Sequence, residues 1–149
     1  MEEGDLPHVL KIEKLSFPTP WHESTFRGEI HNKLFSHPLV IVHRFKRQII
    51  GYLIYWQVED EVHINNIAIH PDYRRKGIAE TVLSKLFTEV SKKGIKRITL
   101  EVRPSNHAAL SLYRKLGFVV LGLKRNYYTT PREDALVLVK FLNLSRNYS

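Results

Sequence analysis

The stretch "INNIAIHPDYRRKGIAETVL", residues 64–83, decides how the chain is organised. Its first half is an apolar run typical of a buried strand, and Pro71 marks the turn that ends it. After residue 77 the spacing of the apolar side chains changes to that of a helix. They recur at Ile78, Val82, Leu86 and Val90. The stretch therefore predicts a buried strand that leads through a turn into the N-terminus of a long helix, which Gly94 ends.

Shorter elements on both sides complete the pattern. Three further helices are predicted at residues 6–16, 23–30 and 106–116, the last with Asn106 or Ser105 as its N-cap. Strands are predicted at residues 39–45, 49–58, 62–70, 97–102, 119–128 and 135–142. The sequence therefore predicts an α/β fold in which helices flank a mixed central sheet.

The composition limits the class of protein. With 149 residues and 43% hydrophobic content, the chain suits one compact domain over residues 1–149. No apolar run approaches the roughly eighteen residues that a membrane span needs, and "MEEGDLPHVLKIEK" lacks the features of a signal peptide, so we expect a cytoplasmic protein. The absence of cysteine excludes disulfides, zinc-thiolate sites and a cysteine nucleophile.

The charge indicates an anionic partner. The net charge is +8 and the pI is near 9.8, which suits a nucleic acid, a phosphorylated cofactor or the ribosome. The segment "KKGIKR", residues 92–97, is typical of a solvated helix end and turn. Contact of this segment with RNA is the alternative.

The segment "YRRKGIA", residues 73–79, places cations where a helix already carries its positive end. Backbone N–H groups in the first turn of a helix lack intrahelical partners, and Gly77 lets an anion approach them while Ala79 keeps that turn narrow. The cations are Arg74, Arg75 and Lys76. These features favour a pyrophosphate site, and a solvated basic helix start is the alternative. The glycine spacings of a P-loop and of a dinucleotide-binding fold are absent.

Three motifs together resemble one known family. They are Arg74-x-x-Gly77-x-Ala79 after "NIAIHPDY", then "LEVRPSNHAALSLYRKLGF" at 100–118, then "RNYY" at 125–128. In this order they resemble the GNAT superfamily of acetyltransferases, and within it the RimI-like branch of ribosomal-protein alanine acetyltransferases and archaeal N-terminal acetyltransferases. The resemblance implies a single GNAT-type domain that uses acetyl-CoA as co-substrate. The strand with which such proteins usually open has no counterpart here before the first helix.

The resemblance assigns a cofactor site. The pantetheine arm would lie along the strand backbone of Ile67, Ala68 and Ile69. The pyrophosphate would be held by the loop and first helical turn, beside Arg74, at Arg75, Lys76, Gly77, Ile78 and Ala79. Asn106 would hydrogen-bond the cofactor near its reactive end, and it is also a candidate helix N-cap.

The resemblance also implies two catalytic residues. Glu101 would be the general base and Tyr113 the general acid for the departing CoA thiolate, because a phenol donates a proton without needing a charge in a dry site. The alternative for Glu101 is an ion pair with Arg103 or Lys96. The alternative for Tyr113 is a place in the core, since it follows the apolar stripe of its helix.

Two loops match the position of the family's acceptor groove. They are "FPTPWHESTF" at 17–26 and "RNYYTTPREDA" at 125–135, and with the turn before the long helix they offer four aromatic candidates for contact with the acceptor: Trp21, Tyr73, Tyr127 and Tyr128. Packing in the local core is the alternative for Trp21. The chemistry needs no metal, and the histidines lack metal-ligand spacing. Three of them are interpreted as surface or capping residues: His63, His70 and His107.

The type of amine follows from a free-energy difference. Deprotonation at pH 7 costs about 1.4 kcal/mol for an α-amine with a pKa near 8 and about 4.6 kcal/mol for a lysine near 10.4. Direct transfer in a ternary complex with one glutamate as base therefore favours protein N-termini, including those of a ribosomal protein or of nascent chains. An acetyltransferase for a small-molecule amine or a lysine side chain is one alternative. A basic nucleic-acid-binding module without catalysis is another, although no recognition helix or RNA-stacking signature is present.

Overall fold

The computed structural model describes residues 1–142 and confirms the predicted α/β fold. The elements in chain order are the 3-10 helix η1 (Glu3–Asp5), α1 (Leu6–Ser16), α2 (Glu23–His31), β1 (Ser36–Val42), β2 (Ile49–Val58), β3 (Glu61–Ile69), the 3-10 helix η2 (Pro71–Tyr73), α3 (Ile78–Lys92), β4 (Arg97–Val102), α4 (His107–Lys115), β5 (Val119–Thr129) and β6 (Arg132–Phe141). The strands form one mixed sheet in the order β1-β2-β3-β4-β6-β5.

Two strands, β1 and β6, begin three residues earlier than predicted. Strand β1 begins at Ser36 and ends at Val42, whereas the apolar run placed it at 39–45. Pro38 lies inside it without disrupting the ladder, because β1 is the outer strand of the sheet within the described residues. Strand β6 begins earlier than predicted, at Arg132, because its polar first residues pair with the end of β5.

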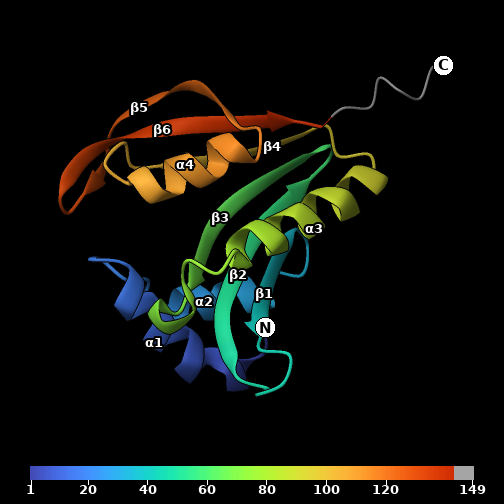
Figure 1. The fold of residues 1–149 in the computed structure, drawn as a ribbon, viewed down its shortest axis with the longest axis vertical. Coiled ribbons are helices and arrows are strands. Elements are labelled where there is room, and N and C mark those ends of the chain that lie inside the picture. The colour runs from blue at the N-terminus through green and yellow to red at the C-terminus, as the bar shows by residue number, and fades with distance from the viewer. Residues whose placement is uncertain (143–149) are drawn as a thin grey trace. The chain divides into compact units, whose positions relative to one another are not determined.

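The described residues form two compact units. The N-terminal unit consists of Met1–Gln57 and Ile64–Ala79, and the C-terminal unit of Val58–His63 and residues 80–142. The core of the N-terminal unit joins the apolar faces of α1 and α2 to residues of β2 and β3, elements that are labelled in Figure 1. Its buried members are Leu6, Val9, Ile12, Phe26, Ile30, Tyr52, Ile54 and Ala68.

The N-terminal residue contacts the outer strand β1. No strand precedes α1 in residues 1–142, as predicted, and η1 stands there instead. The Met1 amino group donates a hydrogen bond of 3.0 Å to the carbonyl oxygen of Pro38 in β1. One carbonyl of the outer strand is thereby satisfied.

Close contact between β2 and β3 depends on one glycine. A Cβ atom on Gly51 would lie 2.7 Å from the carbonyl oxygen of Ala68 and 2.9 Å from Cδ1 of Ile69. Both distances are shorter than van der Waals contact allows, so only glycine fits at position 51. The segment of β3 that it supports is the one predicted to face the pantetheine arm.

The C-terminal unit is built on β4. Strand β4 pairs in parallel with the start of β3 and antiparallel with β6, and β6 pairs antiparallel with β5. One face of β4 carries Ile98, Leu100 and Val102, all buried, and Thr99 on the other face is buried as well. Strand β5 arches away from β6 between its two paired ends (Figure 1), where the register shifts between Lys124 and Tyr128.

Candidate active site

The loop before α3 has the backbone shape that an anion site requires. After η2, Arg75 has φ 62° and Gly77 has φ 75°, so the chain makes two left-handed steps within three residues and then enters α3 at Ile78. A Cβ on Gly77 would meet no atom within 4 Å. The space beside Gly77 is therefore open to a ligand, and the first turn of α3 carries the positive end of the helix dipole.

The three cations of this loop differ in their contacts. Arg74 turns back into the N-terminal unit, where its Nε donates to the carbonyl oxygen of Ile69 at 2.8 Å and one terminal nitrogen donates to Ser16 Oγ at 2.8 Å. Lys76 Nζ lies 5.5 Å from the ring centroid of Tyr73. Arg75 and Lys76 are exposed, so they are the charges best placed to meet an anion.

The strand that leads to this loop is partly covered. Ala68 and Ile69 are buried and Ile67 is half-buried in β3. The ladder continues past Ile69, since the N–H of His70 donates to the carbonyl oxygen of Ile50 at 2.7 Å. His70 also caps η2 as predicted, its Nδ1 accepting from the N–H of Asp72 at 3.1 Å.

A buried glutamate, which no pattern in the sequence predicted as a site residue, anchors the loop that contains Trp21. Glu13 in α1 is 1% exposed and accepts hydrogen bonds from the Trp21 N–H at 2.8 Å, from Asn66 Nδ2 at 3.0 Å and from the Tyr52 hydroxyl. Burial, and then the nearby Glu13, raise the pKa of Tyr52. The Trp21 ring packs on Phe26 at a centroid distance of 5.2 Å, as the core alternative predicted.

Glu101 lies on β4 between two donors. His63 Nε2 is 2.9 Å from Glu101 Oε1, and Lys124 Nζ is 3.4 Å from Oε2. The hydrogen bond from His63 is the main reason that the pKa of Glu101 is lowered, against the effect of burial. The alternative partners predicted for Glu101 were wrong in the described structure, because Lys96 pairs with Asp60 and Arg103 pairs with Glu133. The surface or capping role predicted for His63 was also wrong, because the His63 ring is half-buried and hydrogen-bonds Glu101.

Tyr113 is buried on α4. It is 7% exposed, and its ring packs against Phe118 at 5.5 Å between centroids. Burial, with a smaller effect of the nearby Tyr128, raises the pKa of Tyr113 to about 12. No side-chain hydrogen bond joins its hydroxyl to the part of the chain that the structure describes. The phenol is therefore neutral at pH 7 and has a proton to donate.

The N-terminus of α4 is capped as predicted. Asn106 Oδ1 accepts from the N–H of Ala109 at 3.1 Å, and within residues 1–142 the amide nitrogen of its side chain is left for another contact. His107, the next residue, is exposed as predicted.

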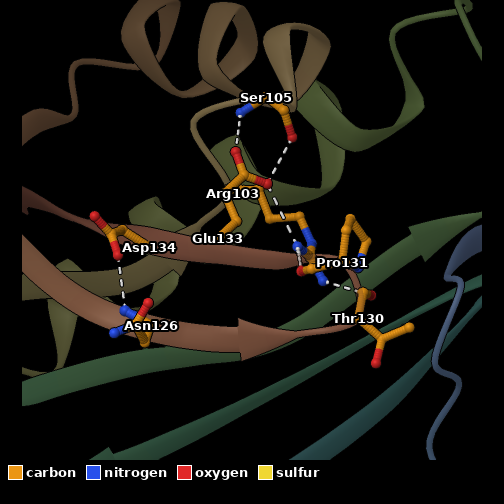
Figure 2. Close-up of polar contacts among 7 residues, drawn as sticks. All are labelled: Arg103, Ser105, Asn126, Thr130, Pro131, Glu133 and Asp134. Atoms are coloured by element: carbon orange, nitrogen blue, oxygen red, sulfur yellow. Dashed lines mark hydrogen bonds and ion pairs between the residues drawn. The ribbon is translucent and has the colours of Figure 1, made fainter.

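The turn between β5 and β6 is held by Arg103 (Figure 2). Its guanidinium donates to the carbonyl oxygens of Pro131 at 2.8 Å and Thr130 at 3.0 Å and pairs with Glu133 at 3.4 Å. It also lies 4.1 Å from the ring centroid of Tyr128. Hydrogen bonds from Ser105 to Glu133 lower the pKa of that carboxyl and tie the turn to the segment before α4 (Figure 2). The backbone around Tyr128 is therefore fixed.

The arch of β5 has its own anchor. The N–H of Asn126, which has φ 51°, donates to Asp134 Oδ1 at 2.7 Å (Figure 2). The next residue, Tyr127, is 48% exposed and packs edge-on against Tyr128. Burial raises the pKa of Tyr128 to about 12, so its hydroxyl stays a protonated donor near neutral pH.

Comparison with known proteins identifies the family. The profile of the acetyltransferase (GNAT) family matches residues 6–118, which is more than half of the chain. The chain belongs to the GNAT acetyltransferase family. It is an acetyl-CoA-dependent N-acetyltransferase, and the resemblance on which the sequence analysis relied is confirmed.

Individual relatives agree with the family. The chain is 36% identical over 140 residues to the ribosomal protein bS18-alanine N-acetyltransferase of Escherichia coli (strain K12), covering 93% of this chain and 92% of the relative. The crystal structure of the ribosomal-protein-S18-alanine N-acetyltransferase from Escherichia coli matches with a TM-score of 0.86 at 35% identity, over 97% of this chain and 92% of that one. Ard1 from Thermoplasma volcanium shares the fold, with a TM-score of 0.82 at 19% identity over 96% and 95% of the two chains.

The residues of this GNAT chain fit acetyl-CoA. The positive-φ loop at Arg75 and Gly77, the exposed cations and the first turn of α3 form a donor set suited to a pyrophosphate. Among residues 1–142 no group of three or more histidine, aspartate or glutamate side chains is placed to hold a metal ion. Within the same range, no helix is both long and apolar enough to cross a membrane.

Proposed function

We propose that this GNAT enzyme is a RimI-like N-α-acetyltransferase that transfers the acetyl group of acetyl-CoA to the N-terminal alanine of ribosomal protein bS18. The observation that carries the proposal is the 36% identity over nearly the full length of both chains to an enzyme named for that substrate. Residues 1–149 act as one acetyltransferase domain in this proposal, in the cytoplasm, where ribosomal proteins are found.

Glu101 is the proposed general base. Because its pKa is lowered, it is ionised at neutral pH and attracts the substrate ammonium group. It takes a proton from the α-amine through a water molecule, which leaves the amine neutral and able to attack the thioester that acetyl-CoA supplies. Its weak basicity supports an α-amine as acceptor, because a lysine side chain costs about 3 kcal/mol more to deprotonate at pH 7.

Tyr113 is the proposed general acid. Its pKa of about 12 keeps the phenol protonated over the working range, and its hydroxyl is not engaged by residues 1–142. It donates its proton to the leaving thiolate and recovers it from solvent.

The cofactor and acceptor contacts follow from local structure. We assign the pyrophosphate to Arg75, Lys76 and Gly77 with the first turn of α3, which includes Ile78 and Ala79. Arg74 stabilises the loop through its hydrogen bonds to the carbonyl oxygen of Ile69 and to Ser16 Oγ. The pantetheine arm is assigned to Ile67, Ala68 and Ile69 and to the free amide of Asn106, and acceptor contacts are assigned to Trp21, Tyr73, Tyr127 and Tyr128.

The proposal is tested by acetylation of three acceptors. Purified protein and acetyl-CoA are given a peptide that begins with the N-terminal alanine of bS18, the same peptide with a blocked N-terminus and an added lysine, and a small polyamine. Rapid acetylation of the first acceptor alone is expected. Faster acetylation of the blocked peptide or of the polyamine would overturn the proposed function.

The cofactor loop is tested by Gly77→Glu. Acetyl-CoA at 100 times its Kd adds about 2.7 kcal/mol to stability, so it raises Tm by about 5 °C or more in the wild type. The glutamate repels the pyrophosphate, so this shift is expected to disappear. Gly94→Glu is the matched control, because Gly94 lies at the other end of α3 with φ 85° and equally open space. A cofactor shift that survives Gly77→Glu would contradict the assignment.

A further inference from the structure

His63 and Glu101 face each other across two parallel strands. In the ladder between β3 and β4, His63 pairs with Thr99, and Glu101 lies two residues further along β4. Residues two apart in a strand project from the same face, so the two side chains meet diagonally. The resulting distance of 2.9 Å between Nε2 and Oε1 is that of a well-formed hydrogen bond.

The two donors that hold Glu101 differ in stiffness. The Glu101 side chain is only 11% exposed, and each of its oxygens has one donor. Lys124 is 52% exposed and lies 3.4 Å away on a long flexible side chain, whereas His63 is 30% exposed and 2.9 Å away on a short one. The imidazole therefore fixes the orientation of the carboxylate, and the ammonium group contributes mainly charge.

We propose that His63 is a positioning residue for Glu101, holding the carboxylate toward the acceptor amine and setting, through its own protonation state, how readily Glu101 accepts a proton. The inference rests on the proposed role of Glu101 as base. A neutral imidazole with its proton on Nε2 donates to the carboxylate and adds no charge. An imidazolium donates the same bond and adds a positive charge, so Glu101 becomes a weaker base when His63 is protonated.

Of the two side chains that contact the Glu101 carboxylate within residues 1–142, only His63 titrates between pH 5.5 and 8. From β5, the ammonium group of Lys124 faces Glu101 at 3.4 Å. Tyr128, whose pKa is affected by Glu101, is protonated below about pH 12. From β6 the residue paired with Glu101 is Val137, and on β4 the residue paired with His63 is Thr99, neither of which ionises. A change in activity between pH 5.5 and 8 that depends on position 63 is therefore attributable to the imidazole.

The kinetic test compares two substitutions. His63→Gln places an amide N–H near the position of Nε2 but cannot titrate, and His63→Leu removes the donor. At pH 8 we expect His63→Leu to lose about tenfold in kcat on the alanine peptide and His63→Gln to lose less than about threefold, with KM for acetyl-CoA unchanged in both. Between pH 8 and pH 5.5 the ratio of wild-type to His63→Gln kcat is expected to fall about threefold, because only the wild type acquires the imidazolium charge. A ratio that is constant with pH, or a His63→Leu protein as active as wild type, overturns the proposal.

A second measurement does not depend on activity. The titration of the His63 ring is followed by NMR in the wild type and in Glu101→Gln, with His107 as an internal reference that has no assigned role. Loss of the carboxylate charge is expected to move the His63 midpoint to lower pH by about one unit, while His107 stays in place. An unchanged His63 midpoint overturns the coupling. A wild-type protein that is inactive on the alanine peptide refutes the proposed function instead, and the NMR titration still decides the coupling.

Discussion

Two glutamates, one in each unit, are held in opposite ways. Glu13 in α1 is 1% exposed, and the donors that it receives from the described part of the chain are all neutral: a backbone N–H, an amide and a phenol. Glu101 in β4 has an 11% exposed side chain and contacts an imidazole and an ammonium group. None of the partners of Glu13 changes charge near neutral pH, whereas the imidazole beside Glu101 does.

The difference separates a structural carboxyl group from a chemical one. The partners of Glu13 come from a loop and two strands, so it fixes the backbone of the segment that carries Trp21. The partners of Glu101 leave 11% of its side chain exposed to solvent and lower its pKa. Burial with hydrogen bonds is therefore not enough to mark a functional acid, and the chemistry of the partners is the better guide.

Substitution of Glu13 is expected to have the largest effect, and the effect is on stability. Glu13→Ala removes the acceptor of the buried Tyr52 hydroxyl and of the partly buried Trp21 N–H, at about 1–3 kcal/mol each, so the free energy of unfolding falls by about 2–5 kcal/mol. Urea denaturation measures this loss. Glu89→Ala, at an exposed position of α3, is the control and should change stability by less than about 0.5 kcal/mol. Similar urea midpoints for Glu13→Ala and Glu89→Ala would contradict the structural role of Glu13 and with it the contrast to Glu101.

Substitution of Glu101 is expected to affect rate instead. Glu101→Gln keeps the shape and deletes the proton acceptor, so kcat on the alanine peptide falls about 1,000-fold at pH 7. Part of the loss is recovered toward pH 9, because an α-amine with a pKa near 8 is by then mostly neutral. Initial rates from pH 6.5 to 9.5 measure both effects. A variant that matches the wild type at every pH would exclude Glu101 as the base.

Tyr113→Phe sharpens the comparison by removing only a proton donor. Because the hydroxyl makes no hydrogen bond to residues 1–142, the variant keeps its packing against Phe118 and its stability. We expect kcat to fall about 100-fold with little change in KM for acetyl-CoA. Stopped-flow turnover and thermal melting measure the two effects. Full activity in the variant would assign Tyr113 to the core and thiolate protonation to solvent.

The smallest expected effect concerns stability in acid. Since the His63 hydrogen bond lowers the pKa of Glu101 in the folded state, the ionised form stabilises the fold above the unfolded pKa of about 4.3, and this contribution is lost as the pH falls through the folded pKa. The stability difference between wild type and Glu101→Gln should therefore be constant from pH 5.5 to 5 and shrink toward pH 3. Urea midpoints at these pH values test it, and a difference that persists unchanged at pH 3 would contradict it.

Most helices and strands could be predicted from the sequence, because the spacing of apolar residues and the helix caps depend only on residues close together in the chain. Strand β2 was predicted at its observed bounds, Ile49–Val58, and the observed cap of α4, Asn106, was one of the two residues predicted for it. Strand β1 was displaced because its apolar residues gave a stronger signal than the polar ones that begin its ladder. The site residues of the cofactor loop came from the family resemblance, and their roles stay predictions.

The contacts of Glu13 and Glu101 could not be predicted from the sequence, because they depend on how segments far apart in the chain align with one another. Glu13 follows Val9 by four residues, so helical spacing did place it on the buried face, but its partners Tyr52 and Asn66 are 39 and 53 residues away. His63 and Glu101 are 38 residues apart and meet only because β3 and β4 pair in parallel. A pattern within one strand does not specify the register with the next.

Gly51 has a consequence for how this enzyme tolerates random mutation. Any side chain there would press on the carbonyl oxygen of Ala68 at 2.7 Å and on Ile69, in the strand assigned to the pantetheine arm. In a library of single variants screened for acetylation, inactive clones should therefore collect at position 51, which carries no reactive group. Alanine at Gly4, Gly28 or Gly122 meets open space and should be silent in the same screen.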